Sequence, residues 1–246
     1  MASSGLSTLQ DFPWEDSIWA VKSSIGFVSY GEFRDHLLAN LPHNSPQTRL
    51  RYTSLITRRY FPDGSLDNLL TQVWRHYRDE PILTDLMRVA TLEMEPAIAS
   101  FVVEELLARQ PGAILDPQVP RAFVETAFGE FKKKSYERLL LSARYLGFVG
   151  RYNKSLVIEE IRTPADAMLI ILHDRLAETP RIVRLAEVLE GHWWQYLGLR
   201  SADAVRDILR AGESAGLLAR YAIVDELEQV TTRFSRNEYI DKALRL

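Results

Sequence analysis

The stretch KKSYERLLLSARYLGFVGRYNKSLVIEE, residues 133–160, joins a basic segment with a periodic apolar pattern to a strand-like segment. The apolar pattern stops at Gly147, in the position of a glycine that follows the last turn of a helix. Beyond it, Phe148-Val149 and Leu156-Val157-Ile158 are the strongest strand signals in the chain, and Asn153-Lys154 lies between them. The stretch therefore predicts a helix that is followed directly by a β-hairpin.

The expected helix has two chemically different faces. The positions that can share an inward stripe are Tyr136, Leu139, Leu140, Ala143 and Leu146. The positions expected to point outward are Lys134, Arg138, Ser142 and Tyr145. Such side chains donate to phosphates and can reach base edges. Lys132, Lys133 and Lys134 stand near the N-terminus of the helix, where free backbone N–H groups also favour an anion.

A second basic helix is expected over residues 45–60, SPQTRLRYTSLITRRY, with Ser45 as N-cap and Pro46 in the first turn. Its inner stripe would be Leu50, Thr53, Ile56 and Tyr60, and its outer row Gln47, Arg51, Ser54 and Arg58. The net charge of the chain is −3, but residues 45–60 and 131–154 together carry +10, so the remainder carries −13. An acidic protein with two basic helices can still present a phosphate-binding surface.

Helix, turn, basic helix, glycine and hairpin is the order of a winged helix, whose second helix enters the major groove while the wing touches the DNA backbone. The tip Arg151-Tyr152-Asn153-Lys154 has the chemistry of such a wing. The alternative is an ordinary solvated surface, because arginine and lysine usually lie outside. The residues expected to contact nucleic acid are Ser45, Gln47, Thr48, Arg49, Arg51, Arg58, Arg59, Lys132, Lys133, Lys134, Ser135, Arg138, Ser142, Arg144, Arg151 and Lys154.

The whole sequence predicts a mainly α protein, a helical bundle with winged-helix or helix-turn-helix-like modules and one or two small β-hairpins. The expected divisions are an N-terminal extension at 1–24, a helix-turn-helix-like domain at 25–116, a winged-helix-like module at 117–163 and a C-terminal helical domain at 164–246. Helices are expected at 164–178, 180–190 and 201–215. The segment 216–221 echoes 147–152, which suggests a second winged-helix-like unit, although a glycine followed by apolar residues is also a common way to leave a helix.

Several functional classes have no motif in this chain. The absence of cysteine excludes disulfides and Cys-ligated zinc, and it suits a reducing cytoplasm. No phosphate-binding glycine loop, nucleophile elbow or metal-binding histidine pair is present, so we expect no catalytic residue, metal or cofactor, and no enzyme. His173-Asp174 is better explained as a histidine on the surface of a helix or partly buried than as a catalytic fragment. No apolar run approaches the length of a membrane span, so we expect a soluble, cytoplasmic protein.

The cluster His192-Trp193-Trp194-Gln195-Tyr196 has two interpretations. Tryptophan is often a buried anchor, which would place Trp193 and Trp194 in the core of the C-terminal helices. It is also frequent at interfaces, so the pair is a candidate protein-docking surface.

The segment Ser45-Pro-Gln-Thr-Arg-Leu-Arg-Tyr-Thr-Ser-Leu-Ile-Thr-Arg-Arg59 resembles the opening of a basic helix in the BrxA family, a small accessory component of the BREX phage-defence systems of bacteria. The apolar segment 97–107 and the run from Lys132 to Val149 are also similar to that family, and the resemblance covers roughly residues 25–160. It implies a non-enzymatic, mainly helical protein that binds DNA beside a methyltransferase and other defence proteins. The 80 or so residues after the hairpin and the first 25 depart from the family pattern.

These observations predict a DNA-binding accessory protein of a bacterial antiviral defence system, with double-stranded DNA and other defence proteins as partners. One alternative is a scaffold whose basic helices meet acidic proteins. Another is an RNA-binding protein, since basic helical surfaces also bind RNA.

Overall fold

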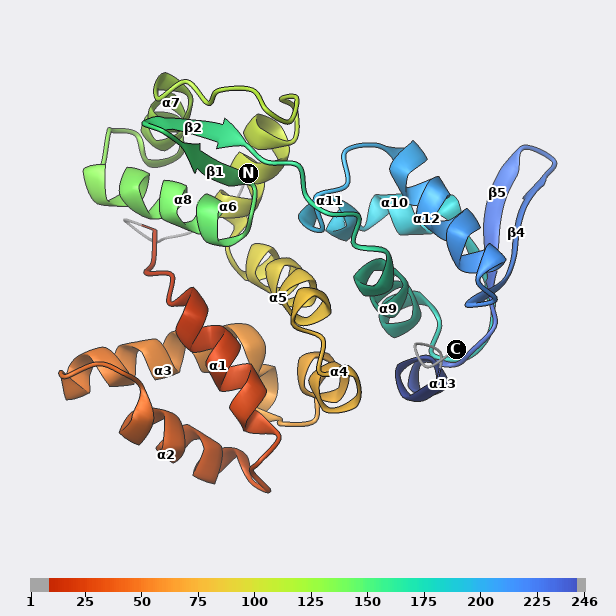
Figure 1. Ribbon diagram of the computed structural model, residues 1–246, viewed down its shortest axis with the longest axis horizontal. Coiled ribbons are helices and arrows are strands. Elements are labelled where there is room, and N and C mark those ends of the chain that lie inside the picture. The colour runs from red at the N-terminus through yellow and green to blue at the C-terminus, as the bar shows by residue number, and fades with distance from the viewer. Residues whose placement is uncertain (1–8, 243–246) are drawn as a thin grey trace. The chain divides into compact units, whose positions relative to one another are not determined.

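The computed structural model describes residues 9–242 and shows a mainly helical protein with two small antiparallel sheets (Figure 1). The expected mainly α architecture with small hairpins is therefore confirmed. The described residues form two compact units: residues 9–14 and 92–162 form unit 1, and residues 15–91 and 163–242 form unit 2. No helix within 9–242 is both long and apolar enough to cross a membrane.

Unit 1 is a set of helices followed by a hairpin. Its elements are α6 (Pro96–Ser100), the π-helical turn η2 (Phe101–Leu106), α7 (Gln118–Phe128), α8 (Lys133–Tyr145), β1 (Val149–Tyr152) and β2 (Ser155–Ile158). β1 and β2 pair antiparallel. Ile114 forms an isolated antiparallel bridge with Val157 of β2, so it lies beside the hairpin in the position of a third strand. α8 packs against α7, α6 and β1, and Phe101, Leu139 and Phe148 are buried between these elements.

The change from α8 to the hairpin follows directly from the residues at the junction. Gly147 has φ of 82°, in the left-handed region that favours glycine, and the N–H of Phe148 donates to the carbonyl of Ala143 at 2.9 Å. This capped end turns the chain into β1. Asn153, one of the few residue types that tolerate positive φ, has φ of 54° at the hairpin turn.

The first half of unit 2 is entirely helical. Its elements are α1 (Trp14–Ser24), α2 (Tyr30–Asn40), α3 (Pro46–Tyr60), the short turn η1 (Pro62–Gly64), α4 (Leu69–Tyr77) and α5 (Glu80–Met94), the last of which continues into unit 1. α2 packs against α3, and the rings of Phe33 and Phe61 lie 4.6 Å apart between their centroids. The Tyr60 hydroxyl lies 2.6 Å from Oγ1 of Thr91, which ties the end of α3 to α5 inside the core.

The second half of unit 2 combines helices with a three-stranded sheet. Its elements are α9 (Ala165–Leu176), β3 (Ile182–Arg184), α10 (Leu185–Glu190), α11 (Trp193–Tyr196), α12 (Ala202–Ser214), β4 (Leu218–Val224), β5 (Leu227–Thr232) and α13 (Arg236–Lys242). The sheet order is β3-β5-β4 with antiparallel pairs, and α12 packs against β4. α13 packs against both α9 and α4.

The element order of unit 1 recurs in residues 165–232. In both segments a helix is followed by a short extended piece, by further helices and then by a hairpin. The extended piece is Ile114 in unit 1 and β3 in residues 165–232. Each pairs with the second strand of its hairpin, β2 and β5 respectively. Gly216 repeats the geometry of Gly147, with φ of 72° and a hydrogen bond of 2.8 Å from the N–H of Leu217 to the carbonyl of Gly212. The echo between 147–152 and 216–221 thus corresponds to the same helix-to-hairpin junction in two places.

The elements and divisions of the structure differ from the sequence-based expectations in three places. Residues 182–184 form β3 rather than part of a helix over 180–190, because they gain a ladder with β5 that only the folded sheet provides. The segment expected to be an N-terminal extension contains α1, and Leu9, Phe12 and Trp14 of this segment are buried. Its residues 1–8 lie outside the described residues. Residues 92–116 pack with 117–162, whereas a division was expected between them.

Candidate nucleic-acid interface

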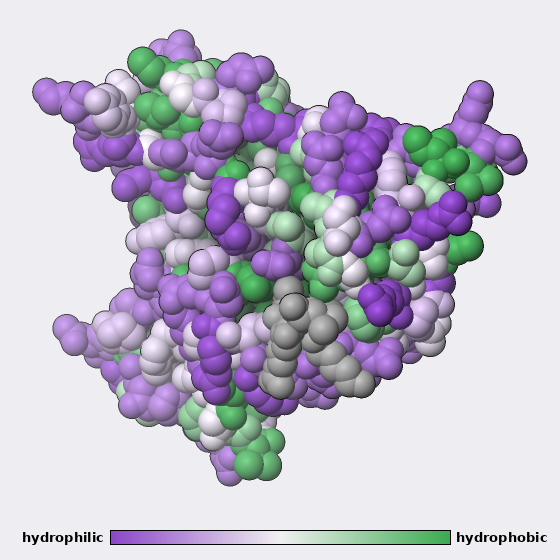
Figure 2. Space-filling model, turned by 45° about the vertical axis from the view of Figure 1, so that its right-hand side comes forward, coloured by the Kyte–Doolittle hydropathy of each residue, from purple (hydrophilic) through white to green (hydrophobic). Residues whose placement is uncertain are grey.

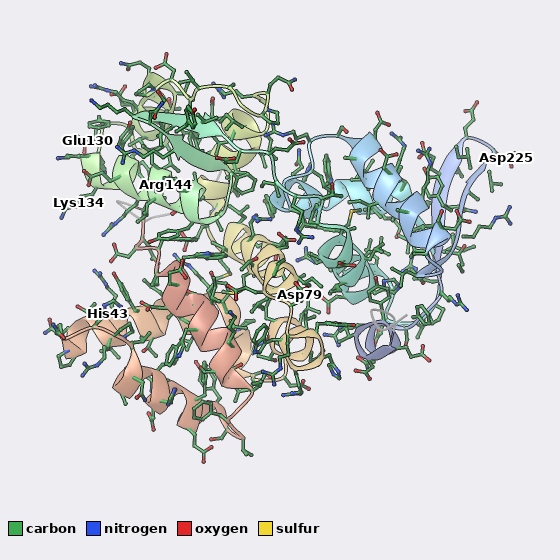
Figure 3. All side chains as sticks on the ribbon, viewed as in Figure 1. His43, Asp79, Glu130, Lys134, Arg144 and Asp225 are labelled. Carbon is green, nitrogen blue, oxygen red and sulfur yellow. The ribbon has the colours of Figure 1, made fainter. Side chains whose placement is uncertain are left out.

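One face of α8 is exposed and carries cations at both ends. Lys134 and Arg144 mark these ends (Figure 3), with Glu137 and Leu141 between them at spacings of three, four and three residues. The four side chains therefore form one row along the helix. Lys133 is exposed beside the row and lies 3.8 Å from the Glu137 carboxylate, a separation that makes only a weak exposed ion pair.

The opposite face of α8 is set in the core of unit 1, largely as its periodicity predicts. Leu139, Ala143 and Leu146 are fully buried, and Tyr136 and Leu140 are half-buried. This burial fixes the rotation of the helix, so the row from Lys134 to Arg144 faces away from the core.

A segment near the N-terminus lies along a third face of α8. The backbone N–H of Leu9 donates to Oγ of Ser135 at 3.3 Å, and Nη2 of Arg138 lies 2.5 Å from Oδ1 of Asp11. Farther along the helix, the ring of Phe12 stacks on Tyr145 with 6.1 Å between centroids. We call residues 9–14 the N-terminal strap.

The strap covers two of the predicted nucleic-acid contacts. Ser135 is fully buried beside Leu9, and Arg138 is partly buried in its ion pair with Asp11. Ser142, which was expected to point outward, is also fully buried. Periodicity on α8 alone identifies a polar face but does not reveal that residues more than 120 positions away cover it. Acidic Asp11 and apolar Phe12 were the only sequence signals for this contact.

The tip of the β1–β2 hairpin is basic and exposed. Arg151, Tyr152, Asn153 and Lys154 are all exposed, Tyr152 to 72%. Because α8 contacts β1, this tip belongs to the same unit as the exposed row of the helix (Figure 1). Acidic residues lie at the other end of β2, where Glu159 and Glu160 are exposed. The Glu159 carboxylate covers Gly150 so closely that an added Cβ there would lie 1.6 Å from Oε1.

Lys132 is placed differently from the two lysines that follow it. Its side chain is about one quarter exposed, and its ammonium lies 3.7 Å from the Glu130 carboxylate and 5.7 Å from the centre of the Phe128 ring. Lys132 therefore packs against the end of α7, whereas Lys133 and Lys134 extend from the first turn of α8.

α3 in unit 2 presents a basic outer row close to the expected one. Ser45 caps the helix by accepting a hydrogen bond from the N–H of Thr48 at 3.4 Å, as its sequence predicts. The exposed outer residues are Gln47, Leu50, Arg51, Ser54 and Arg58. Leu50 was expected inside but is 51% exposed. α8 belongs to unit 1, so the α3 row is a surface of its own unit.

Two arginines of α3 are not on this outer row. Nη1 of Arg49 donates to the carbonyl of His43 at 2.7 Å, and His43 in turn lies 2.8 Å from Oδ2 of Asp16 through Nε2. Arg49 thus holds the loop before α3 against α1. Arg59 is only 4% exposed and packs within the unit, and Thr48 is half-buried. Arg49 and Arg59 are therefore structural residues rather than exposed cations.

The remaining candidates lie in the core of unit 2. Trp193 and Trp194 are 2% and 8% exposed, and Nε1 of Trp194 donates to the carbonyl of Leu189 at 3.1 Å, so the pair packs inside and not on a docking surface. His173 is fully buried, more deeply than the surface or partly buried position expected for it, and its Nδ1 lies 2.8 Å from the carbonyl oxygen of Leu169. Among residues 9–242, no three acidic or histidine side chains are grouped closely enough to hold a metal ion.

Comparison with known proteins gives no relative for this chain. No family model, no curated protein and no solved structure matches it.

Proposed function

We propose that the protein binds duplex DNA through α8 and the β1–β2 hairpin, and that unit 1 is a winged-helix domain. The observation that carries the proposal is a set of five exposed cations on one helix and the hairpin that contacts it. They are Lys133, Lys134, Arg144, Arg151 and Lys154. The order of the helices, the bridge at Ile114 and the hairpin supports the same conclusion.

In this proposal α8 enters the major groove, which is wide enough for a helix. Lys134 and Arg144 contact phosphates or guanine edges at the two ends of the row, and the hairpin tip contacts the backbone. Glu137 and Leu141 lie between the cations, where a carboxylate can accept from a cytosine amino group and an aliphatic side chain can contact a thymine methyl. The Glu137 carboxylate repels DNA phosphates and so lowers the sequence-independent affinity of this row for DNA. Its place between the two cations therefore favours a role in recognising bases.

The outer row of α3 is proposed as a separate DNA-contacting surface, on unit 2. Arg51 and Arg58 supply positive charge seven residues apart, and Gln47 and Ser54 supply hydrogen-bonding groups on the same row. Its contribution is expected to be sequence-independent, because phosphate contacts carry no sequence information.

The proposed biological role is that of a non-enzymatic accessory protein in a bacterial antiviral system of the BREX type, acting in the cytoplasm with other defence proteins. This part rests on the resemblance of residues 25–160 to the BrxA family. It is tested separately from DNA binding, by asking whether deletion of the gene removes phage resistance in a host that carries such a system.

The experiment for DNA binding compares two double charge reversals with the same change in net charge. Lys134→Glu/Arg144→Glu alters the exposed row of α8. Arg34→Glu/Arg75→Glu alters exposed arginines of α2 and α4 whose side chains form no hydrogen bond or ion pair with any described residue. Fluorescence anisotropy with labelled duplex DNA should show binding for wild type and the control, and weak binding for the α8 variant.

Two results would count against the proposal. Equal loss of binding in both variants would mean that total charge, and not α8, determines affinity. A helix that binds in the major groove should prefer duplex DNA, because the deep, narrow major groove of A-form RNA does not admit a helix. Stronger competition by double-stranded RNA than by duplex DNA would therefore favour the RNA alternative.

A further inference from the structure

The second hairpin, β4–β5, ends in an exposed apolar surface. Ile223 is 62% exposed, Val224 47% and Leu227 55%. Figure 2 shows hydrophobic residues gathered near the end of this hairpin, next to hydrophilic ones. The first hairpin has a basic tip instead, so the two hairpins differ in chemistry although they follow the same helix-to-strand junction.

β4 is also an open edge. It is the outer strand of the order β3-β5-β4, and within residues 9–242 no strand pairs with its outer side. Val224 and Leu227 flank a two-residue turn, so they exchange hydrogen bonds with each other, and the antiparallel alternation then directs the backbone groups of Tyr221 and Ile223 to the open edge. Exposed aliphatic edges of this kind pair readily with another strand.

The charges at the two ends of β4 are opposite. Arg220 lies at one end, and Asp225 and Glu226 form the turn at the other. All three are exposed, and none of their side chains forms a hydrogen bond or ion pair with another described residue. The segment Arg220-Tyr-Ala-Ile-Val-Asp-Glu226 is therefore complementary to itself when two copies run antiparallel.

We propose that β4 is the contact surface for a second copy of this chain. Antiparallel pairing of two β4 strands sets Tyr221 of one copy opposite Ile223 of the other, with the small Ala222 on the two-fold axis. Arg220 of each copy then lies diagonally across from Glu226 of the other, in the turn that follows β4. The two three-stranded sheets join into one, and the pairing is closed because each copy uses its only β4 edge.

The contact is small, and this sets the expected affinity. One short strand and three aliphatic side chains bury less than the roughly 1,200–2,000 Å² of a stable interface. The dimer should therefore be weak, with a Kd of about 10–100 µM. This inference does not rest on DNA binding, and either can hold without the other.

Sedimentation equilibrium of the full chain over rising concentration tests the proposal. Wild type should pass from monomer to dimer. Arg220→Glu sets two acids against each other at both proposed Arg220–Glu226 contacts, and Glu226→Arg sets two cations against each other there, so each variant alone should dimerise about tenfold more weakly. An equimolar mixture of the two variants should recover dimers, because an acidic strand then meets a basic one.

Circular dichroism of each variant confirms that it is folded. A wild-type chain that stays monomeric to the highest concentration would overturn the proposal. So would a dimer that neither variant weakens, or variants whose mixture fails to recover association.

Discussion

The buried histidine of unit 2 gives a prediction that can be worked out numerically. The ring of His173 stacks on Tyr239 of α13 with 3.9 Å between centroids, and its Nδ1–H donates to the carbonyl of Leu169 at 2.8 Å. Nε2 is buried and has no hydrogen-bond partner among the described residues. Burial lowers the pKa of His173 from 6.5 to about 4, although the hydrogen bond to Leu169 opposes the change.

The lowered pKa means that protonation favours the unfolded chain. Between pH 6.5 and about 4 the unfolded state binds a proton at His173 that the folded state does not. The stabilisation is complete above pH 6.5 and is lost as the pH falls toward the folded pKa. One pKa unit corresponds to about 1.4 kcal/mol, so the change in the free energy of unfolding is on the order of 3 kcal/mol.

The assay is urea unfolding of wild type and His173→Phe from neutral pH down to about pH 4. Phenylalanine keeps a ring against Tyr239 but cannot titrate. The difference in the free energy of unfolding between the two proteins should change by about 3 kcal/mol in favour of the variant as the pH falls through this window. Parallel pH profiles for the two proteins would refute the reasoning, as would an NMR titration of His173 near its ordinary pKa.

Two further substitutions separate binding from stability. Glu137→Gln removes the only acid from the exposed row of α8, so it should tighten binding to random-sequence DNA about threefold and reduce discrimination between sites, as a competition assay would reveal. Equal or weaker general binding would contradict this role. Arg49→Ala should lower the free energy of unfolding by about 1 kcal/mol in urea titrations, because the bond to the loop carbonyl is lost, whereas exposed Gln47→Ala should leave it unchanged. A larger effect of Gln47→Ala would contradict the structural role of Arg49.

Local signals in the sequence were sufficient where neighbouring residues determine the structure. Ser45 and Pro46 set the start of α3, because the hydroxyl accepts from a free N–H of the first turn and proline has none to lose. Gly147 set the end of α8, because the following chain must pass through positive φ. The hairpin after it was predicted from two short apolar runs, Phe148-Val149 and 156–158, on either side of Asn153-Lys154.

Contacts between distant residues explain most of the errors. The polar stripe of α8 with Arg138 and Ser142 is predicted to face DNA, but Asp11 of the strap pairs with the arginine and the serine is buried. Arg59 looked like one more surface cation in a basic helix, yet it is almost completely buried. Composition and periodicity do not distinguish a polar residue that faces solvent from one that meets a distant segment.

The strand β3 was missed for a related reason. Residues 182–184 are too few to show a strand pattern, and their extended conformation depends on the pairing of Val183 with Val230, nearly 50 residues later. The neighbouring helical pattern of α10 extended the prediction over them. Short strands that complete a sheet are set by their partner and not by their own residues.

The salt dependence of DNA affinity tests the central claim most directly. Each phosphate contact contributes about −0.9 to the slope of log affinity against log salt concentration. Wild type and Arg34→Glu/Arg75→Glu should share one steep slope, and Lys134→Glu/Arg144→Glu should have a slope shallower by about 1.8, for two lost contacts. An identical slope in all three proteins, or no binding of wild type at low salt, would contradict the assignment of α8 as the DNA-binding helix.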